Sequence, residues 1–163
     1  MDESLKNWLA EHKIHYMMHT HPAVFTVPEA KIHCGHIPGT HIKNLFLRNK
    51  KTDEYYLVTI PAEKRLDLKR FQKLIGAPSV RFATPEALFE ILGLTPGAVT
   101  PMGLVNDTKH RAVFILEKEL WTAEILCVHP NVNTATLQLK NEDFRKFIAA
   151  TGTEIRLVEL PYI

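Results

Sequence analysis

IKNLFLRNKKTDEYYLVTI, residues 42–60, is the stretch of sequence that decides the fold. Residues 42–48 and 54–60 are rich in β-branched, aromatic and other apolar side chains, and the residues between these two runs are polar. Two such runs joined by a short polar turn are typical of an antiparallel β-hairpin. The sequence therefore predicts a hairpin, and the other elements are placed outward from it.

Short helices and short strands alternate on both sides of this hairpin. Thr26-Val-Pro-Glu29 has the spacing of a capping box and predicts a helix from Val27 toward Cys34. Other helices are expected after the caps Ser4, Asp67, Thr84 and Asn141. Leu74 and Phe89 are expected on the buried faces of two of these helices. Further strands are expected at residues 15–18, 79–82, 112–116, 125–129, 134–139 and 154–160. This interleaving predicts an α/β (mixed α+β) fold.

The length and composition set the broad class. A chain of 163 residues with 45% hydrophobic residues suits one globular domain, so we expect residues 1–163 to form a single domain. The formal net charge is only +2, so any nucleic acid would have to be bound by local basic patches. The chain begins without an apolar signal segment, and Cys34 and Cys127 lack CxxC spacing. We therefore expect a cytoplasmic protein with free thiols.

Three segments could carry chemistry. Residues 94–103 hold two prolines and two glycines, which suit either a loop that exposes backbone N–H groups or an ordinary turn. Residues 37–47 place Lys43 on the leucine-bearing face of a strand, at a cavity mouth or extended to solvent. Residues 129–136 gather one His, two Asn and two Thr, which suit a small polar ligand or a hydrogen-bonded hairpin loop equally.

Other kinds of site find little support in the sequence. Seven of the nine histidines precede residue 42, but neither they nor the cysteines show the spacing of zinc ligands. P-loop, dinucleotide-binding and serine-hydrolase motifs are absent. Cys127 alternates within a predicted strand and is expected in the core. We therefore expect neither a metal nor another cofactor.

Four segments together resemble one family of proteins. They are HPAVFTVPEA (residues 21–30), IPGTHIKNLFL (37–47), the stretch from Leu66 to Asp107, and HPNVNTATLQL (129–139). The likeness runs over about residues 19–152 and is to the free-standing relatives of the editing (insertion) domain of bacterial prolyl-tRNA synthetase. Within these, the sequence is most similar to the Ala-tRNA(Pro) deacylases of the ProXp-ala or PrdX type. The resemblance implies a YbaK-like fold with a central mixed β-sheet surrounded by helices.

The resemblance also implies a function and a set of site residues. The function is metal-free hydrolysis of mischarged Ala-tRNA(Pro) to alanine and tRNA(Pro), without a cofactor. Lys43 would hold the ester, Gly97 would lie in the loop that receives its carbonyl, and His129 would shape the pocket against proline. The implied substrate-binding residues are Asn44, Ala98, Val99, Thr100, Pro101, Asn133 and Thr134.

The partner implied by the resemblance is the acceptor end of mischarged tRNA(Pro). Prolyl-tRNA synthetase or an elongation factor would be the protein partner, and neither a membrane nor DNA is expected. Basic residues of the hairpin and of one helix could contact the tRNA backbone or form a solvated face, namely Arg48, Lys50, Lys51, Lys69, Arg70 and Lys73.

Two other functions remain open. One is hydrolysis of another small mischarged aminoacyl-tRNA, such as Cys-tRNA(Pro), and the HPNVN segment argues against it. The other is a non-catalytic module that binds tRNA or a synthetase, and Lys43 argues against that.

Overall fold

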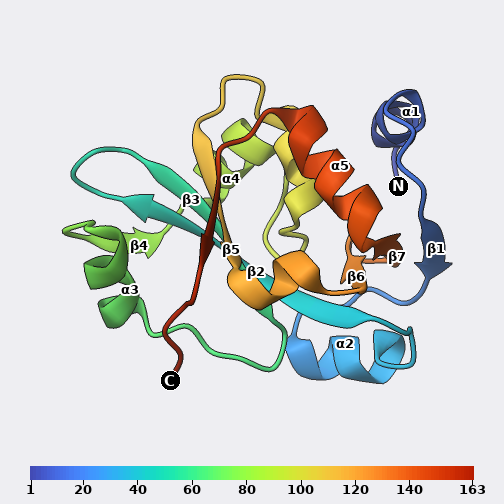
Figure 1. Ribbon diagram of the computed structural model, residues 1–163, viewed down its shortest axis with the longest axis horizontal. Coiled ribbons are helices and arrows are strands. Elements are labelled where there is room, and N and C mark those ends of the chain that lie inside the picture. The colour runs from blue at the N-terminus through green and yellow to red at the C-terminus, as the bar shows by residue number, and fades with distance from the viewer.

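The predicted hairpin is the centre of the fold. The computed structural model describes all 163 residues and contains β2 (Thr40–Asn49) and β3 (Tyr55–Pro61), paired antiparallel with Ile42 opposite Pro61 (Figure 1). All seven residues of β3 are buried, as expected for a strand covered on both faces. The hairpin prediction is therefore confirmed.

The remaining elements surround this hairpin. The helices are α1 (Glu3–Glu11), α2 (Val27–Cys34), α3 (Leu68–Ile75), α4 (Pro85–Leu92), α5 (Asn141–Thr151) and the 3-10 helices η1 (Pro101–Asn106) and η2 (Lys118–Thr122). The other strands are β1 (Met17–Thr20), β4 (Val80–Phe82), β5 (Ala112–Glu117), β6 (Ile125–Val128), β7 (Ala135–Lys140) and β8 (Ile155–Val158). The sheet order is β1-β7-β6-β2-β3-β5-β8, with β4 paired to β2. Because parallel and antiparallel pairs occur together, the predicted α/β fold with a mixed sheet is confirmed.

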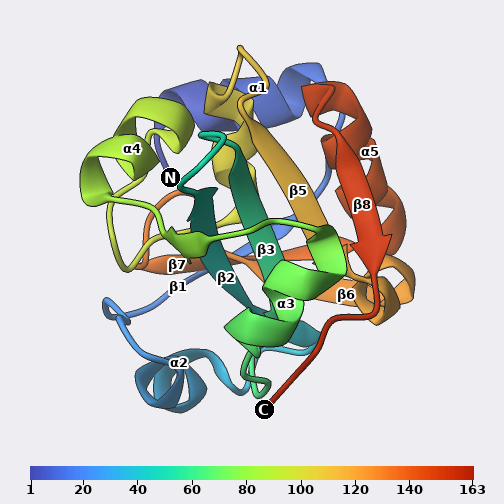
Figure 2. The same cartoon turned by 90° about the vertical axis from the view of Figure 1, so that its left-hand side faces the viewer.

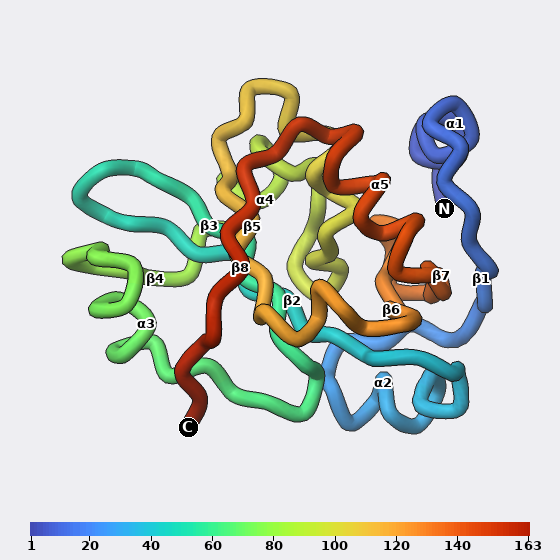
Figure 3. Tube along the Cα trace, in the orientation of Figure 1, coloured from blue at the N-terminus to red at the C-terminus, as the bar shows by residue number.

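Helices cover both faces of the sheet. Side chains of β3 alternate between two cores, so that Leu57 packs with α1, α4 and α5 whereas Val58 packs with Phe71 of α3. Figure 1 shows α3 and α5 on opposite sides of β3, β5 and β8, and Figure 2 shows α3 in front of them. The tube in Figure 3 shows the two chain ends far apart.

One edge of β2 is shared between two short partners, and this positions the site. β6 pairs in parallel with Thr40 and His41, and β4 pairs with the far end of β2 from Leu47 to Asn49. Residues 42–45 lie between these two partners and have no strand beside them on that edge. The backbone and side chains of this part of β2 are therefore open to the loops that form a pocket.

Two predicted helix caps are wrong. Asp2 caps α1 in place of Ser4, because its carboxylate accepts a 2.8 Å hydrogen bond from the Leu5 N–H. Lys140 occupies the cap position of α5, and the Asn141 side chain instead donates to the carbonyls of Trp121 and Ala123. The caps Thr26, Asp67 and Thr84 are confirmed, and each accepts from a backbone N–H of its helix.

Two apolar residues and one strand also differ from expectation. Leu74 is 51% exposed and Phe89 is 66% exposed, although both were expected to be buried. Each lies just outside the stripe of its short helix that faces the sheet. β1 lies two residues later than expected, at Met17–Thr20, where it pairs with β7.

No helix of the structure is long and apolar enough to cross a membrane.

Candidate functional site

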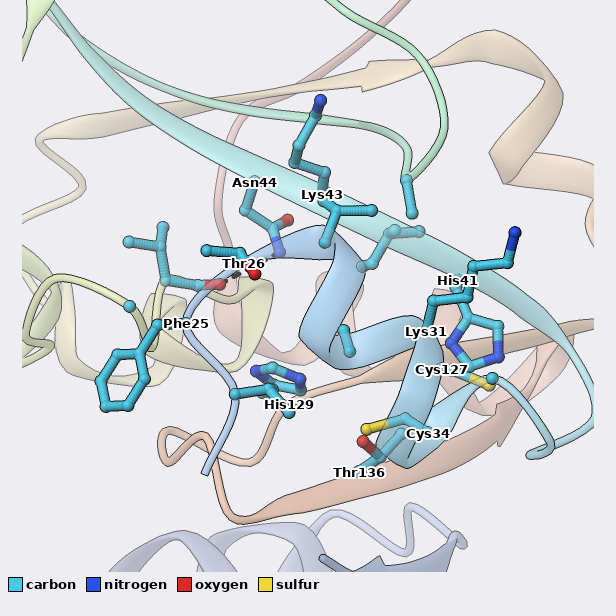
Figure 4. A pocket seen from close by; sticks show the side chains of 18 of the residues that line it. Phe25, Thr26, Lys31, Cys34, His41, Lys43, Asn44, Cys127, His129 and Thr136 are labelled. Carbon is cyan, nitrogen blue, oxygen red and sulfur yellow. Dashed lines mark hydrogen bonds between the residues drawn. The ribbon is translucent and has the colours of Figure 1, made fainter. Parts of the chain in front are cut away.

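A pocket of about 550 Å³ lies between α2 and the open edge of β2 (Figure 4). Such a volume is typical of cavities that bind small molecules or cofactors. One wall is formed by α2 and the segment before it, and the opposite wall by β2. The loop around residues 97–99 and the end of β6 with His129 after it close the pocket between these walls.

The structure brings together five of the residues predicted for the site. Lys43 and Asn44 of β2, Gly97 and Val99 of the loop before η1, and His129 after β6 all line the pocket. They come from three separate parts of the chain, and the fold alone makes them neighbours.

The other predicted substrate-binding residues do not line the pocket. Ala98, Thr100 and Pro101 are buried beneath its surface, where they support the loop. Asn133 donates through Nδ2 to the carbonyl of Val24 at 3.0 Å, and its own carbonyl accepts from the Val24 N–H. The carbonyl of Thr134 accepts from the His21 N–H at 2.9 Å. These contacts hold the segment before α2 in place, so Asn133 and Thr134 support the pocket wall and do not line the pocket.

Lys43 is half-buried at the pocket and has no acidic partner. Its side chain takes part in none of the three ion pairs of the chain and makes no hydrogen bond within the protein. In Figure 4 its ammonium group extends from β2 away from the His129 ring. A positive charge without a counter-ion at a pocket is free to bind an anion or a polar ligand group.

The Gly97 loop presents free backbone donors. Gly97 adopts φ +89°, a conformation that residues with a side chain rarely adopt. The Ala98 N–H donates to the carbonyl of Thr95, whereas the N–H groups of Gly97 and Val99 find no acceptor in the protein. Because both residues line the pocket, their unpaired N–H groups are candidate donors to a carbonyl oxygen of a ligand.

Asn44 fixes this loop to the sheet. Its Nδ2 donates to the carbonyl of Val99 at 3.1 Å, and its Oδ1 accepts from the Thr59 hydroxyl at 2.6 Å. Thr59 is fully buried in β3, so the chain of contacts runs from the core to the pocket. Asn44 therefore sets the position of the free N–H groups relative to Lys43.

His129 is neutral in the folded protein. Burial, together with the smaller effects of the nearby His21 and His41, lowers its pKa to about 4. The His21 and His129 ring centres are 6.2 Å apart. A neutral imidazole on the pocket wall adds bulk and hydrogen-bonding capacity but no charge at neutral pH.

The other histidines near the pocket are held by hydrogen bonds. Nε2 of His21 lies 2.9 Å from the Thr136 hydroxyl, and Nε2 of His41 lies 2.9 Å from the carbonyl of Ile37. His19 pairs with Gln138 on the neighbouring strand. No group of three or more His, Cys, Asp or Glu side chains is arranged to hold a metal ion.

Both cysteines are free, buried and part of the pocket wall. The expected burial of Cys127 is therefore confirmed, and its thiol donates to the carbonyl of Pro38. Burial raises the pKa of Cys127 to about 11 and also raises the pKa of Cys34. Neither thiol is thus activated as a nucleophile.

The basic residues form an exposed surface away from the pocket. Lys50 and Lys51 lie on the turn of the hairpin, and Lys69, Arg70 and Lys73 lie on α3. Figure 1 shows both elements at the end of the molecule opposite β1. Arg48 is paired with Asp53, which reduces its availability to a phosphate.

The contribution of α2 to the pocket was missed in the sequence. The residues of α2 and of the segment before it that line this wall are Phe25, Thr26, Val27, Ala30, Lys31 and Cys34, and Thr136 of β7 also lines the pocket. The capping box predicted the helix itself, but no local pattern shows which face of a short helix covers a cavity. The position of Phe25 directly before the cap was the one available signal.

Comparisons with known proteins show the family of this chain. Residues 21–147 match the family described as the aminoacyl-tRNA editing domain. The chain is 37% identical to the prolyl-tRNA editing protein ProX of Acetoanaerobium sticklandii, over 93% of each chain. It is 38% identical to prolyl-tRNA synthetase associated domain-containing protein 1 of Mus musculus, over 81% of this chain and 80% of that one.

A solved structure shows the same fold. The crystal structure of a candidate trans-editing enzyme for prolyl-tRNA synthetase superposes with a TM-score of 0.70 at 24% identity, covering 98% of both chains. At 24% identity this structural likeness shows the fold alone, whereas the sequence matches show the family. The chain belongs to the aminoacyl-tRNA editing domain family and is a homologue of the prolyl-tRNA editing proteins.

Proposed function

We propose that this protein is a trans-acting deacylase that hydrolyses Ala-tRNA(Pro) to alanine and tRNA(Pro). The observation that carries the proposal is one pocket with an unpaired lysine, Lys43, on one side and two free backbone N–H groups, at Gly97 and Val99, on the other. Membership of the editing family and the names of its relatives support an aminoacyl ester as the substrate. In this proposal residues 1–163 act as one editing unit.

The reaction needs a bound carbonyl and a positioned water molecule. The N–H groups of Gly97 and Val99 bind the ester carbonyl oxygen and stabilise the negative charge that develops on it in the transition state. The Lys43 ammonium binds the oxygens of the ester and of the terminal ribose. Water attacks the carbonyl carbon, and the neighbouring ribose hydroxyl relays the proton of this water to the leaving ribose oxygen. The ester C–O bond then breaks, which releases alanine and leaves a free hydroxyl on the tRNA.

Selectivity comes from the size of the side-chain site. A synthetase that accepts proline rejects the smaller alanine poorly, because a missing methylene changes binding by only about 1–3 kcal/mol. A second pocket that admits alanine and excludes proline corrects this error. His129 is the wall that a prolyl ring would meet, and its neutral state avoids a buried charge next to the apolar substrate group.

The tRNA body is bound elsewhere on the molecule. Lys50 and Lys51 on the hairpin turn and Lys69, Arg70 and Lys73 on α3 offer positive charge to the phosphate backbone. Other predicted residues hold the pocket in shape, because their polar atoms form hydrogen bonds within the protein or their side chains are buried. They are Asn44, Ala98, Thr100, Pro101, Asn133 and Thr134.

The experiment that tests the proposal is ester loss from tRNA(Pro) charged with alanine, cysteine, serine or proline. We expect the alanyl ester to disappear fastest, the prolyl ester to persist, and EDTA to leave the rate unchanged. Faster loss of the cysteinyl ester would mean that the substrate is Cys-tRNA(Pro) in place of Ala-tRNA(Pro). Intact esters in all four reactions would refute the deacylase function.

A further inference from the structure

Phe25 lies at the rim of the pocket, and its aromatic ring is largely exposed to solvent. The residue is 66% exposed, although it lines the pocket and its ring lies next to Gly97. Figure 4 shows its ring at the margin of the pocket, pointing outward from the segment before α2. Burying an apolar ring is favourable, so a ring left open at a binding pocket requires an explanation.

The local structure does not explain this exposure. An apolar residue directly before a helix cap usually packs against the fourth residue of the helix. Thr26 is the cap of α2, and the fourth helical residue is Ala30, whose methyl group covers little of a phenyl ring. The start of the helix therefore leaves the ring unburied.

The backbone around Phe25 is nevertheless fixed. Val24 on one side is buried; its N–H donates to the backbone carbonyl of Asn133, and its carbonyl accepts from Nδ2 of the Asn133 side chain. Thr26 on the other side caps α2 through a hydrogen bond from the Glu29 N–H. The backbone that carries the exposed ring is therefore pre-organised for contact with a ligand.

One edge of this ring packs closely against Gly97. A Cβ atom on Gly97 would lie 2.9 Å from Cδ1 of Phe25, which is closer than such atoms normally approach. The ring therefore flanks the residue whose N–H group is proposed to bind the ester carbonyl. In an aminoacylated tRNA, a single ribose joins that ester to the terminal adenine base.

We propose that Phe25 is a stacking platform for the 3′-terminal adenine of the aminoacylated tRNA. This inference rests on the proposed function, because it takes the ester to be bound at Gly97. The pocket volume of about 550 Å³ suits a nucleoside bearing an aminoacyl group, and is much larger than the methyl side chain of alanine needs. The adenine would bury the open face of the ring, which no residue of the protein covers. Each base stacked on an aromatic side chain typically contributes about 1–3 kcal/mol to the binding free energy.

The test compares two non-hydrolysable ligands by calorimetry. One is the alanyl amide of 3′-amino-3′-deoxyadenosine, and the other is the same compound without the base. Phe25→Ala and Phe25→Leu should weaken binding of the adenine compound by about 5- to 100-fold, whereas Phe25→Trp should bind it at least as tightly as the wild type. Binding of the base-free compound should not change in any of these variants.

Phe89→Ala is the matched control, because Phe89 is equally exposed, at 66%, and does not line the pocket. Its affinity for both compounds should equal that of the wild type. Wild-type affinity in Phe25→Leu, an equal loss for both compounds, or failure of the wild type to bind the adenine compound would overturn the proposal.

Deacylation of Ala-tRNA(Pro), measured in parallel, separates the two claims. A wild type that hydrolyses the ester while Phe25→Leu binds normally would refute the stacking platform alone. A wild type that leaves the ester intact but binds adenine through Phe25 would refute the deacylase function alone.

Discussion

The hydroxyl of Thr100 donates a 2.6 Å hydrogen bond to the backbone carbonyl of His129. Thr100 is fully buried, and the same hydroxyl accepts from the Met102 N–H at the start of η1. The loop that carries the free N–H groups and the segment that carries the imidazole are therefore held together. Any change at Thr100 should affect both the binding of the carbonyl and the size of the side-chain site.

Thr100→Val tests this connection. Valine keeps the shape but leaves the carbonyl of His129 without its partner, which should lower the free energy of unfolding by about 1–3 kcal/mol. The kcat/KM for Ala-tRNA(Pro) should also fall, while Thr100→Ser, which keeps the hydroxyl, should remain close to wild type in both measurements. Urea denaturation and ester hydrolysis check this, and a valine variant that matches the wild type in both would show that the bond has no role.

Gly97→Ala should impair catalysis more than folding. The new methyl group would meet the Phe25 ring at 2.9 Å and would displace the N–H groups of the loop. A misplacement of about 1 Å can lower a rate by ~100-fold, so we expect kcat to fall by about 10- to 100-fold.

Gly76→Ala is the matched control for this prediction. Gly76 also has a positive φ, +70°, but a Cβ there meets nothing within 4 Å and the residue lies outside the pocket. Both alanine variants should lose some stability because of the backbone strain. Only Gly97→Ala should lose activity, and equal activity of the two variants would contradict the role of the loop.

The stability of the protein should depend on pH through His129. Its pKa is about 4 in the folded chain and about 6.5 in the unfolded chain, so between these values the unfolded chain binds a proton that the folded chain does not. Stability is therefore fully present above pH 6.5 and is lost as the pH falls toward 4.

His129→Gln removes this titration. From pH 7 to pH 4.5 the wild type should lose about 2–3 kcal/mol of unfolding free energy more than the variant loses. Urea denaturation of both proteins over this range provides the measurement. Parallel curves would mean that the imidazole has an ordinary pKa and is solvated in the folded state.

His129→Ala should change substrate selectivity. If the imidazole blocks a prolyl ring, its removal should raise kcat/KM for Pro-tRNA(Pro) by about 10- to 200-fold and lower kcat/KM for Ala-tRNA(Pro) by a smaller factor. Steady-state hydrolysis of both esters separates this from a supporting role. A parallel decrease with both substrates would assign His129 to the structure of its own loop.

Much of the fold could be predicted because its signals are local. The hairpin of β2 and β3 follows from two apolar runs around a polar turn, and α2, α3 and α4 follow from their caps Thr26, Asp67 and Thr84. The exposure of Leu74 and Phe89 could not be predicted in this way. It depends on which parts of α3 and α4 the sheet covers, and this is decided by contacts distant in the sequence.

The sequence predicts which segments form the site, but it does not predict how their side chains are arranged around the pocket. The three segments singled out by composition do meet at one pocket, through Lys43, Gly97 and His129. Within each segment, however, the sequence does not distinguish a residue that faces the cavity from one that supports it. Val99 faces the pocket and the adjacent Thr100 is buried behind it, a difference that arises from the hydrogen bonds of Asn44 and His129 across the fold.

The most direct test of the proposed function is the rate at which Lys43→Ala hydrolyses Ala-tRNA(Pro). Lys118→Ala is the control, since Lys118 is an exposed lysine outside the pocket, and thermal unfolding shows whether both variants fold. We expect Lys43→Ala to remain folded, because Lys43 forms no ion pair, and to lose about 100- to 1,000-fold in kcat, as other enzymes do when one group that stabilises the transition state is removed. A folded Lys43→Ala protein that hydrolyses the ester at the rate of Lys118→Ala would contradict the proposed site.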